Sequence, residues 1–194
     1  MKRDKLGENK KLDLNLVAEK LSKNLNNSDF LGGNAAVVAL LRECNKELEL
    51  LFVKRAEISK DPWSGQIAFP GGKRCPQDND LKDTVIRETC EETSLNLRKG
   101  CRFLGTLAPI NSIQRLGMRI LPFVVWQLDG QEIRLNHELT NFFWVPLTEL
   151  AKNEGTTQYL SKNYPAYVIQ NNVVWGITYQ ISNSLVSMLQ SLTE

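Results

Sequence analysis

Hydrophobic residues recur along the chain with two different patterns, which separate expected helices from expected strands. The spacing of apolar positions predicts amphipathic helices at 12–24 and 81–93, and the last apolar segment predicts a closing helix at 177–192. A short helix is expected at 147–152. Apolar runs bounded by polar or turn residues predict strands at 35–41, 48–53, 66–69, 102–108, 119–128, 141–146 and 166–170.

The order of these elements predicts the class of fold. The runs at 35–41 and 48–53 flank a charged turn, which predicts a β-hairpin. Pro70-Gly71-Gly72 predicts a sharp turn, and Asp78 or Asp80 is placed to cap the helix at 81–93. Helices and strands are mixed without regular alternation, so we expect an α+β arrangement within the α/β class.

Composition describes an ordinary globular chain and disfavours several functions. The chain has 194 residues, of which 42% are hydrophobic and 24% charged, enough for one sizeable core. Its formal charge of +2 does not indicate a basic nucleic-acid scaffold, so nucleic acid is not an expected partner. The single histidine, His137, removes multi-histidine zinc sites and disfavours a Ser-His-Asp triad.

Cysteines and the absence of long apolar segments suggest a compartment. No two of the four cysteines are spaced as C-x-x-C, so we expect reduced, mostly buried thiols in a cytosolic protein. The first 15 residues lack the apolar region of a secretory signal. No stretch approaches the ~20 apolar residues that span a bilayer. We therefore expect a cytoplasmic protein that does not enter a membrane.

Three carboxylates stand close together on the helix expected at 81–93. Glu88, Glu91 and Glu92 are spaced i, i+3 and i+4, so all three should project from one helical face. A cation between them would relieve their repulsion, and oxygen ligands select hard ions such as Mg²⁺ or Mn²⁺. The alternative interpretation is a solvated acidic surface.

The segment before this helix favours a metal site over an acidic surface. The turn FPGGK at 69–73 brings backbone close to whatever the carboxylates hold. Metal-binding acids opposite flexible cations suit a substrate with adjacent phosphates, and a carboxylate or a metal can activate water for attack on phosphorus. The cations that precede the helix are Lys54, Arg55, Lys60, Lys73 and Arg74.

Residues 72–95 resemble the Nudix box, G-x5-E-x7-R-E-U-x-E-E-x-G-U, where U is aliphatic. The matching residues are Gly72, Arg87, Glu88, Glu91, Glu92 and Leu95. The departures are one inserted residue before Arg87, Asn79 in place of the first glutamate, Thr89 in place of the aliphatic residue and Ser94 in place of the later glycine. In the family the first acid pairs with the arginine, so Asp78 or Asp80 would have to replace it.

The resemblance implies an α/β/α sandwich with mixed β-sheets and Mg²⁺-dependent hydrolysis of a nucleoside diphosphate linked to another group. We expect one domain over 1–194, with its core at about 35–152, an N-terminal helix and a C-terminal strand–helix extension. The family makes Glu91 and Glu92 metal ligands, Glu88 a ligand or the base, and Arg87 a structural member of the catalytic set. Glu138, just before the W-V-P-L strand, is the candidate for a further metal-binding acid; a surface acid at a strand start is the alternative.

A narrower resemblance links residues 50–72 to the motif L-L-T-x-R-[SA]-x3-R-x3-G-x3-F-P-G-G of coenzyme A pyrophosphatases. Residues 164–181 resemble the tail of the same proteins, so the likeness covers roughly 35–190. Phe52 replaces the threonine, and Lys60 offers a point charge where the family has a guanidinium. The residues expected to contact substrate phosphates are Arg55, Lys60, Gly71, Gly72 and Lys73.

The expected reaction is hydrolysis of coenzyme A or a derivative to 3′,5′-ADP and 4′-phosphopantetheine. An alternative within the family is ADP-ribose, a dinucleotide or a damaged nucleoside triphosphate. An alternative of another class is a non-catalytic module that binds a nucleotide or RNA, which the departures at 79 and 94 would support. For the enzymatic functions we expect a small-molecule nucleotide as partner. The number of metals, the identity of the base and the formation of a homodimer stay open.

Overall fold

The computed structural model describes residues 14–27, 32–59 and 63–193. In chain order the elements are α1 (Leu14–Asn24), β1 (Ala35–Cys44), β2 (Glu47–Arg55), β3 (Ile67–Ala68), β4 (Gly71–Lys73), α2 (Leu81–Thr93), β5 (Cys101–Thr106), β6 (Ile110–Asn111), β7 (Arg119–Gln127), β8 (Leu139–Pro146), α3 (Leu147–Lys152), β9 (Glu154–Tyr159), β10 (Lys162–Ile169), β11 (Asn172–Trp175) and α4 (Gly176–Thr193).

The main sheet is mixed. Its strands follow the order β3-β2-β1-β7-β5, while β4 pairs with β1, β6 with β7 and β8 with β2. The strands β1 and β2 form the predicted antiparallel hairpin, and β1 runs parallel to β7. The prediction of an α+β fold with mixed sheets is therefore confirmed.

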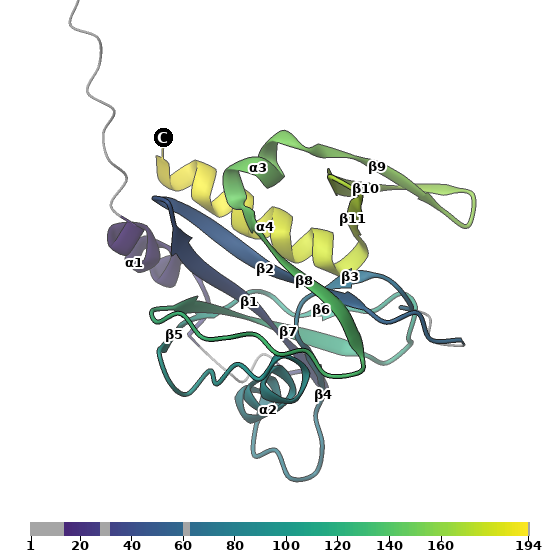
Figure 1. Ribbon diagram of the computed structural model, residues 1–194, viewed down its shortest axis with the longest axis horizontal. Helices are drawn as coiled ribbons and strands as arrows, with labels where there is room; N and C mark the ends of the chain where they lie inside the picture. Colours follow the sequence, from purple (N-terminus) through teal and green to yellow (C-terminus); the bar gives the residue numbers. More distant parts are fainter. Residues whose placement is uncertain (1–13, 28–31, 60–62, 194) are drawn as a thin grey trace, which may run out of the picture.

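Side chains of the central strands alternate between the two faces of this sheet, as the two-residue period of a strand requires. In β1, Ala36, Val38 and Leu40 pack with α2 on one face. Ala39 and Leu41 point to the opposite face, where α1 and α4 cover the sheet. Figure 1 shows α2 on one side of the strands and α4 on the other. This is the expected α/β/α sandwich.

The strands β1 and β2 diverge at the end away from their hairpin, and the segment 67–73 fills the space between them. There β2 pairs with β3, with Val53 opposite Ala68, and β1 pairs with β4, with Ala36 opposite Gly72. The prediction of a sharp turn at 70–72 is therefore wrong for both glycines, which belong to a strand. The φ angle of Gly71 is +144°, and a Cβ there would overlap the carbonyl oxygen of Ala36.

A second, three-stranded antiparallel sheet of β9, β10 and β11 precedes the last helix. The sequence predicted one strand here, at 166–170, and missed β9 and β11. The strand β9 reads EGTTQY, which has no apolar face to reveal it. The sheet lies beside β3, and Thr178 of α4 donates a hydrogen bond of 3.1 Å to the carbonyl oxygen of Ile67. The C-terminal extension thus supports the edge of the main sheet.

The expected helices agree with the structure, apart from their ends. Helix α1 is confirmed from Leu14 onward, while residues 12 and 13 lie outside the described part of the chain. Helices α2 and α3 have the predicted bounds, and α4 begins one residue earlier than predicted. Among the described residues, no helix is long and apolar enough to cross a membrane.

All four cysteines are free, as expected. Their expected burial is wrong, however: Cys44, Cys75 and Cys101 are half-buried, and Cys90 is exposed on α2.

Candidate active site

The helix α2 has well-defined ends that set the position of its acidic residues. At its start, the carboxylate of Asp80 accepts a hydrogen bond of 2.7 Å from the backbone N–H of Asp83, which satisfies one of the free N–H groups of the first turn. At its end, Ser94 takes the left-handed conformation with φ of +62°, and its N–H donates to the carbonyl oxygen of Cys90. Asp80 is therefore the cap of the helix.

Asp78 has a different role, because it pairs with Arg87. The Arg87 guanidinium donates two hydrogen bonds to it, of 3.0 Å from Nε and 2.9 Å from Nη2. Thr84 and the backbone N–H of Cys75 donate to the same carboxylate, which is only 6% exposed. Arg87 holds the pKa of Asp78 well below its ordinary value, against the opposing effect of burial. Asp78 thus fills the place that Asn79 leaves open.

The same guanidinium lies between two of the candidate ligands. Its Nη1 donates to Glu88 Oε1 at 2.7 Å and to Glu91 Oε2 at 3.1 Å, while Nη2 also donates to the carbonyl oxygen of Lys73. The two carboxylates therefore converge on one positive group. Arg87 connects the end of β4, the acid at 78 and the face of α2 that carries Glu88 and Glu91.

Glu92 is buried against the glycine strand. Its carboxylate accepts a hydrogen bond of 2.8 Å from the backbone N–H of Gly71, and the residue is 5% exposed. Burial is the main cause that raises the pKa of Glu92 to about 8; repulsion from Glu88 and Glu138 adds to this, and the Gly71 N–H and Arg55 oppose it. Near neutral pH the protonated form of this carboxyl group is therefore favoured, and a bound metal ion would favour the ionised form.

Glu88 lies directly over Gly72. A Cβ on Gly72 would overlap the Glu88 carboxylate, so the absence of a side chain there leaves the space that this acid occupies. Burial raises the pKa of Glu88; Arg87 opposes this effect, and the negative charges of Glu91 and Glu138 add to it. Glu88 and Glu92 thus both lie against β4, while the Glu91 side chain remains 57% exposed.

Glu138 comes from a distant part of the sequence. Its backbone oxygen accepts a hydrogen bond of 2.8 Å from Ala56, the residue after β2. Nearby, Asn136 donates from its backbone to the carbonyl oxygen of Glu92 at 3.0 Å. These bonds hold the loop before β8 beside the end of α2, and the charge of Glu138 acts on both Glu88 and Glu92.

These residues fit a hard divalent cation. Within the described ranges, no three His, Cys, Asp or Glu side chains are already gathered around one point, and Arg87 donates hydrogen bonds to both Glu88 and Glu91. The donors are nonetheless all carboxylate oxygens, which Mg²⁺ and Mn²⁺ prefer. Two of them, Glu88 and Glu92, have a raised pKa that a cation would lower.

The expected phosphate contacts have different surroundings. Arg55 ends β2 and is close enough to lower the pKa of Glu92. Lys73 is exposed at the end of β4, whereas the N–H of Gly71 is already bonded to Glu92. Lys60 lies outside the described residues. Arg74 donates instead to the carbonyl oxygens of residues 78 and 79, so its guanidinium braces the loop before α2.

Sequence reasoning missed the link between this site and the loop at 112–118. The Asn34 side chain donates a hydrogen bond of 2.7 Å to the carbonyl oxygen of Gly117. It also accepts a hydrogen bond of 2.9 Å from the backbone N–H of Arg119. The backbone oxygen of Asn34 accepts a bond from the N–H of Arg74. No local signal in the sequence could have identified these partners.

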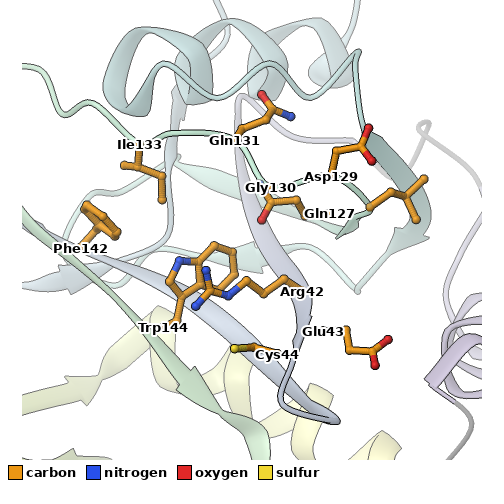
Figure 2. A pocket seen from close by; sticks show the side chains of 11 residues that line it. Arg42, Glu43, Cys44, Gln127, Asp129, Gly130, Gln131, Ile133, Phe142 and Trp144 are labelled. Atoms are coloured by element: carbon orange, nitrogen blue, oxygen red, sulfur yellow. The ribbon is translucent and has the colours of Figure 1, made fainter.

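A cavity of about 360 Å³ lies elsewhere, on the α2 side of the sheet (Figure 2). The guanidinium carbon of Arg42 lies 4.1 Å from the centre of the Trp144 ring. The loop after β7 forms the opposite wall of the cavity. Arg42 comes six residues after Ala36, the partner of Gly72, which puts it about 20 Å further along β1. This cavity is therefore separate from the acidic site.

A family model described as the NUDIX domain matches residues 33–166. Among curated relatives, an uncharacterized Nudix hydrolase named NudL from Photorhabdus laumondii is 31% identical over 163 residues, which cover 80% of this chain and 84% of the relative. The human mitochondrial coenzyme A diphosphatase NUDT8 is 29% identical over 164 residues, covering 80% of this chain and 69% of the relative.

Solved structures show the same fold at low sequence identity. A MutT/nudix family protein from Enterococcus faecalis has a TM-score of 0.53 at 13% identity, covering 94% of this chain and 70% of that one. The NUDIX domain of Shewanella oneidensis NrtR, crystallised with ADP ribose, has a TM-score of 0.51 at 16% identity, covering 82% of this chain and 87% of that one.

Proposed function

This chain belongs to the Nudix hydrolase family, and from that premise we propose that it hydrolyses the diphosphate of coenzyme A or an acyl derivative. The observation that carries the hydrolytic part is the placement of Glu88 and Glu92 against the two glycines of β4. That placement supports a site in which acidic groups and a strand segment without side chains meet a diphosphate.

The choice of coenzyme A is supported by two likenesses in sequence. One is the likeness of residues 50–72 to the coenzyme A pyrophosphatase motif. Arg55, a residue of this motif, is close enough to lower the pKa of Glu92. The other is the likeness to the human relative, itself named a coenzyme A diphosphatase. The products would be 3′,5′-ADP and 4′-phosphopantetheine.

In the proposed reaction, the oxygen of a water molecule forms a bond to one phosphorus of the diphosphate. The bond from that phosphorus to the bridging oxygen breaks, and the second phosphate leaves with the bridging oxygen. Glu88, whose carboxylate lies over Gly72, would accept the proton that the water loses. The positive charges of Arg55 and Lys73 would face the phosphate oxygens.

The metal-binding residues would be Glu91, Glu92 and Glu138, and also Glu88 where it serves as a ligand rather than as the base, with Mg²⁺ or Mn²⁺ as the ion. Such an ion, when bound, supplies Lewis-acid charge to phosphate oxygens. Arg87 would position Glu88 and Glu91 through its Nη1 while its other nitrogens hold Asp78 and β4. Glu92 would contribute a charge held in place by the Gly71 N–H.

A substrate panel tests the proposal directly. The purified protein is incubated with coenzyme A, acetyl-coenzyme A, ADP-ribose, a diadenosine polyphosphate and an oxidised nucleoside triphosphate, each with Mg²⁺, with Mn²⁺ and with a chelator. We expect hydrolysis of coenzyme A to the two named products, and none with the chelator. Strong turnover of another compound without turnover of coenzyme A would overturn the substrate. Binding of nucleotides or RNA without any turnover would favour the non-catalytic alternative.

A further inference from the structure

Two loops flank the strands β3 and β4 at the acidic end of the sheet. One follows β2 and leads into β3 from residue 56 to residue 66, of which 60–62 lie outside the described residues. The other connects β6 to β7 at 112–118. Because β1 and β7 are parallel, with Ala35 opposite Ile120, the second loop lies at the end of β1 that carries β4 (Figure 1).

Each loop is anchored beside the acidic site. The first begins at Ala56, whose N–H donates to the backbone oxygen of Glu138. The second is held by Asn34, which bonds Gly117 with its side chain and the N–H of Arg74 with its backbone oxygen. The two anchors lie on either side of the strand that contacts Glu88 and Glu92.

The loops meet through Trp63 and Arg115. The guanidinium carbon of Arg115 lies 5.3 Å from the centre of the Trp63 ring, a cation–π distance. Arg115 is exposed, and among the described residues no carboxylate forms an ion pair with it. Its backbone is fixed, because its N–H donates to Ser112 Oγ and its carbonyl oxygen accepts from Met118. An aromatic ring and a guanidinium therefore lie together where the two loops meet.

We infer that Arg115, supported by Trp63, binds the 3′-phosphate of coenzyme A. The inference rests on the proposed function. In coenzyme A the adenine and the 3′-phosphate are carried by the same ribose, whose 5′ oxygen leads to the diphosphate. A guanidinium presents hydrogen-bond donors in a fork that matches a phosphate group, and an adjacent indole ring offers a surface for the base. The pair would thus determine specificity from two loops that are anchored beside the acidic site.

A contact between Arg115 and the 3′-phosphate should affect only the substrates that carry this group. Dephospho-coenzyme A has the same diphosphate, adenine and pantetheine but lacks the 3′-phosphate, and ADP-ribose lacks it too. Removing the Arg115 charge should therefore weaken the binding of coenzyme A selectively. The KM for coenzyme A should rise, while kcat should change little. The variant should hydrolyse coenzyme A and dephospho-coenzyme A with nearly equal kcat/KM.

The test compares kcat/KM for coenzyme A and dephospho-coenzyme A in the wild type, Arg115→Ala, Arg115→Lys and Trp63→Leu. We expect Arg115→Ala to lower kcat/KM for coenzyme A by about tenfold to a hundredfold, the range for a hydrogen bond between charged groups, and for dephospho-coenzyme A by less than about threefold. Arg115→Lys should restore part of the preference. Arg102→Ala removes an exposed arginine of β5 and serves as the matched control.

A second measurement does not depend on turnover. Inhibition by 3′,5′-ADP should exceed inhibition by 5′-AMP in the wild type, and Arg115→Ala should abolish the difference. Equal losses for both substrates, or no loss for either, would overturn the role of Arg115 while leaving the proposed function intact. A wild-type protein that hydrolyses neither coenzyme A nor dephospho-coenzyme A would overturn both proposals.

Discussion

Arg87 binds Asp78 through two parallel hydrogen bonds of 3.0 and 2.9 Å across the loop between β4 and α2. The pair holds this loop to the face of α2, and Arg87 uses its remaining donors for Glu88, Glu91 and Lys73. One buried acid therefore sets the orientation of the guanidinium on which two candidate ligands depend.

Replacement of Asp78 by Asn should destabilise the protein. The variant leaves Arg87 without its main counter-charge, and breaking such a pair costs several kcal/mol when it is fully buried. The Arg87 side chain is 29% exposed, so we expect the free energy of unfolding, measured in urea, to fall by about 2–3 kcal/mol. Asp80→Asn is the matched control, because asparagine caps a helix as well as aspartate does; it should change stability by less than about 0.5 kcal/mol.

The same pair predicts how stability depends on acid pH. The pKa of Asp78 is lower in the folded protein than in the unfolded chain, so its ionised form favours folding. This contribution is present above the ordinary aspartate pKa of about 3.9 and is lost as the pH falls below it. Unfolding measured between pH 6 and pH 2 should show a smaller loss in Asp78→Asn than in the wild type. Parallel curves for the two proteins would contradict the assignment.

The raised pKa of Glu92 predicts that stability depends on pH in the opposite direction. Its pKa is raised to about 8 in the folded protein, so the protonated form favours folding. That contribution is complete below the ordinary glutamate pKa of about 4.3 and is lost as the pH rises toward 8. In chelator, Glu92→Gln should therefore be more stable than the wild type at pH 8, with a smaller difference at pH 5. Glu132→Gln, at a residue whose side chain is 72% exposed, should show no such trend.

Gly72→Ala should damage activity more than stability. The added methyl group would overlap the carboxylate of Glu88, a flexible side chain that can move away. We expect a change in unfolding free energy below about 1 kcal/mol and a loss of kcat of about 10²-fold, the effect of a misplaced catalytic group. Gly130→Ala adds the same methyl group where no atom lies within 4 Å, and it should retain full activity.

Addition of Mg²⁺ should raise the unfolding temperature of the wild type, since an ion that binds only the folded state stabilises it. Binding near pH 7 should also release protons from Glu92, detectable by calorimetry in buffers with different ionisation enthalpies. Glu91→Gln should weaken the Mg²⁺ effect and lower the rate by about 10²-fold or more. Glu19→Gln, at an exposed acid of α1, should behave as the wild type. Unchanged hydrolysis by Glu91→Gln would exclude the proposed mechanism.

Ser94→Gly should stabilise the protein. Ser94 holds φ of +62°, a conformation that glycine adopts at lower cost. The variant loses an exposed hydrogen bond of 3.1 Å from Ser94 Oγ to the carbonyl oxygen of Arg134, so we expect a net gain of about 0.5 kcal/mol. Ser94→Ala loses the same bond and keeps the unfavourable φ, so it should be less stable than the wild type in thermal unfolding.

Local sequence signals predicted most of the helices and central strands. The bounds of α2 follow from the spacing of Leu81, Val85 and Thr89, all buried in the structure, and the hairpin of β1 and β2 follows from two adjacent apolar runs. These patterns act over a few residues, within one element. For the same reason the positions of Glu88, Glu91 and Glu92 on one helix could be read directly.

The differences arise where an element depends on a distant partner. Gly71 and Gly72 look like a turn in isolation and become a strand because Val37 and Ala36 pair with them. The strand β9 has almost no apolar side chains, and it exists because β10 pairs with it.

The acidic helix, its three glutamates and the family resemblance came from the order of residues alone, because helical spacing is a local property. The tertiary structure decided that Asp78 pairs with Arg87 while Asp80 caps the helix, and that Glu92 is buried while Glu91 faces solvent. It also brought Glu138 and Arg115 to the same end of the sheet. Those outcomes depend on burial and on contacts between residues far apart in the chain, which no local pattern encodes.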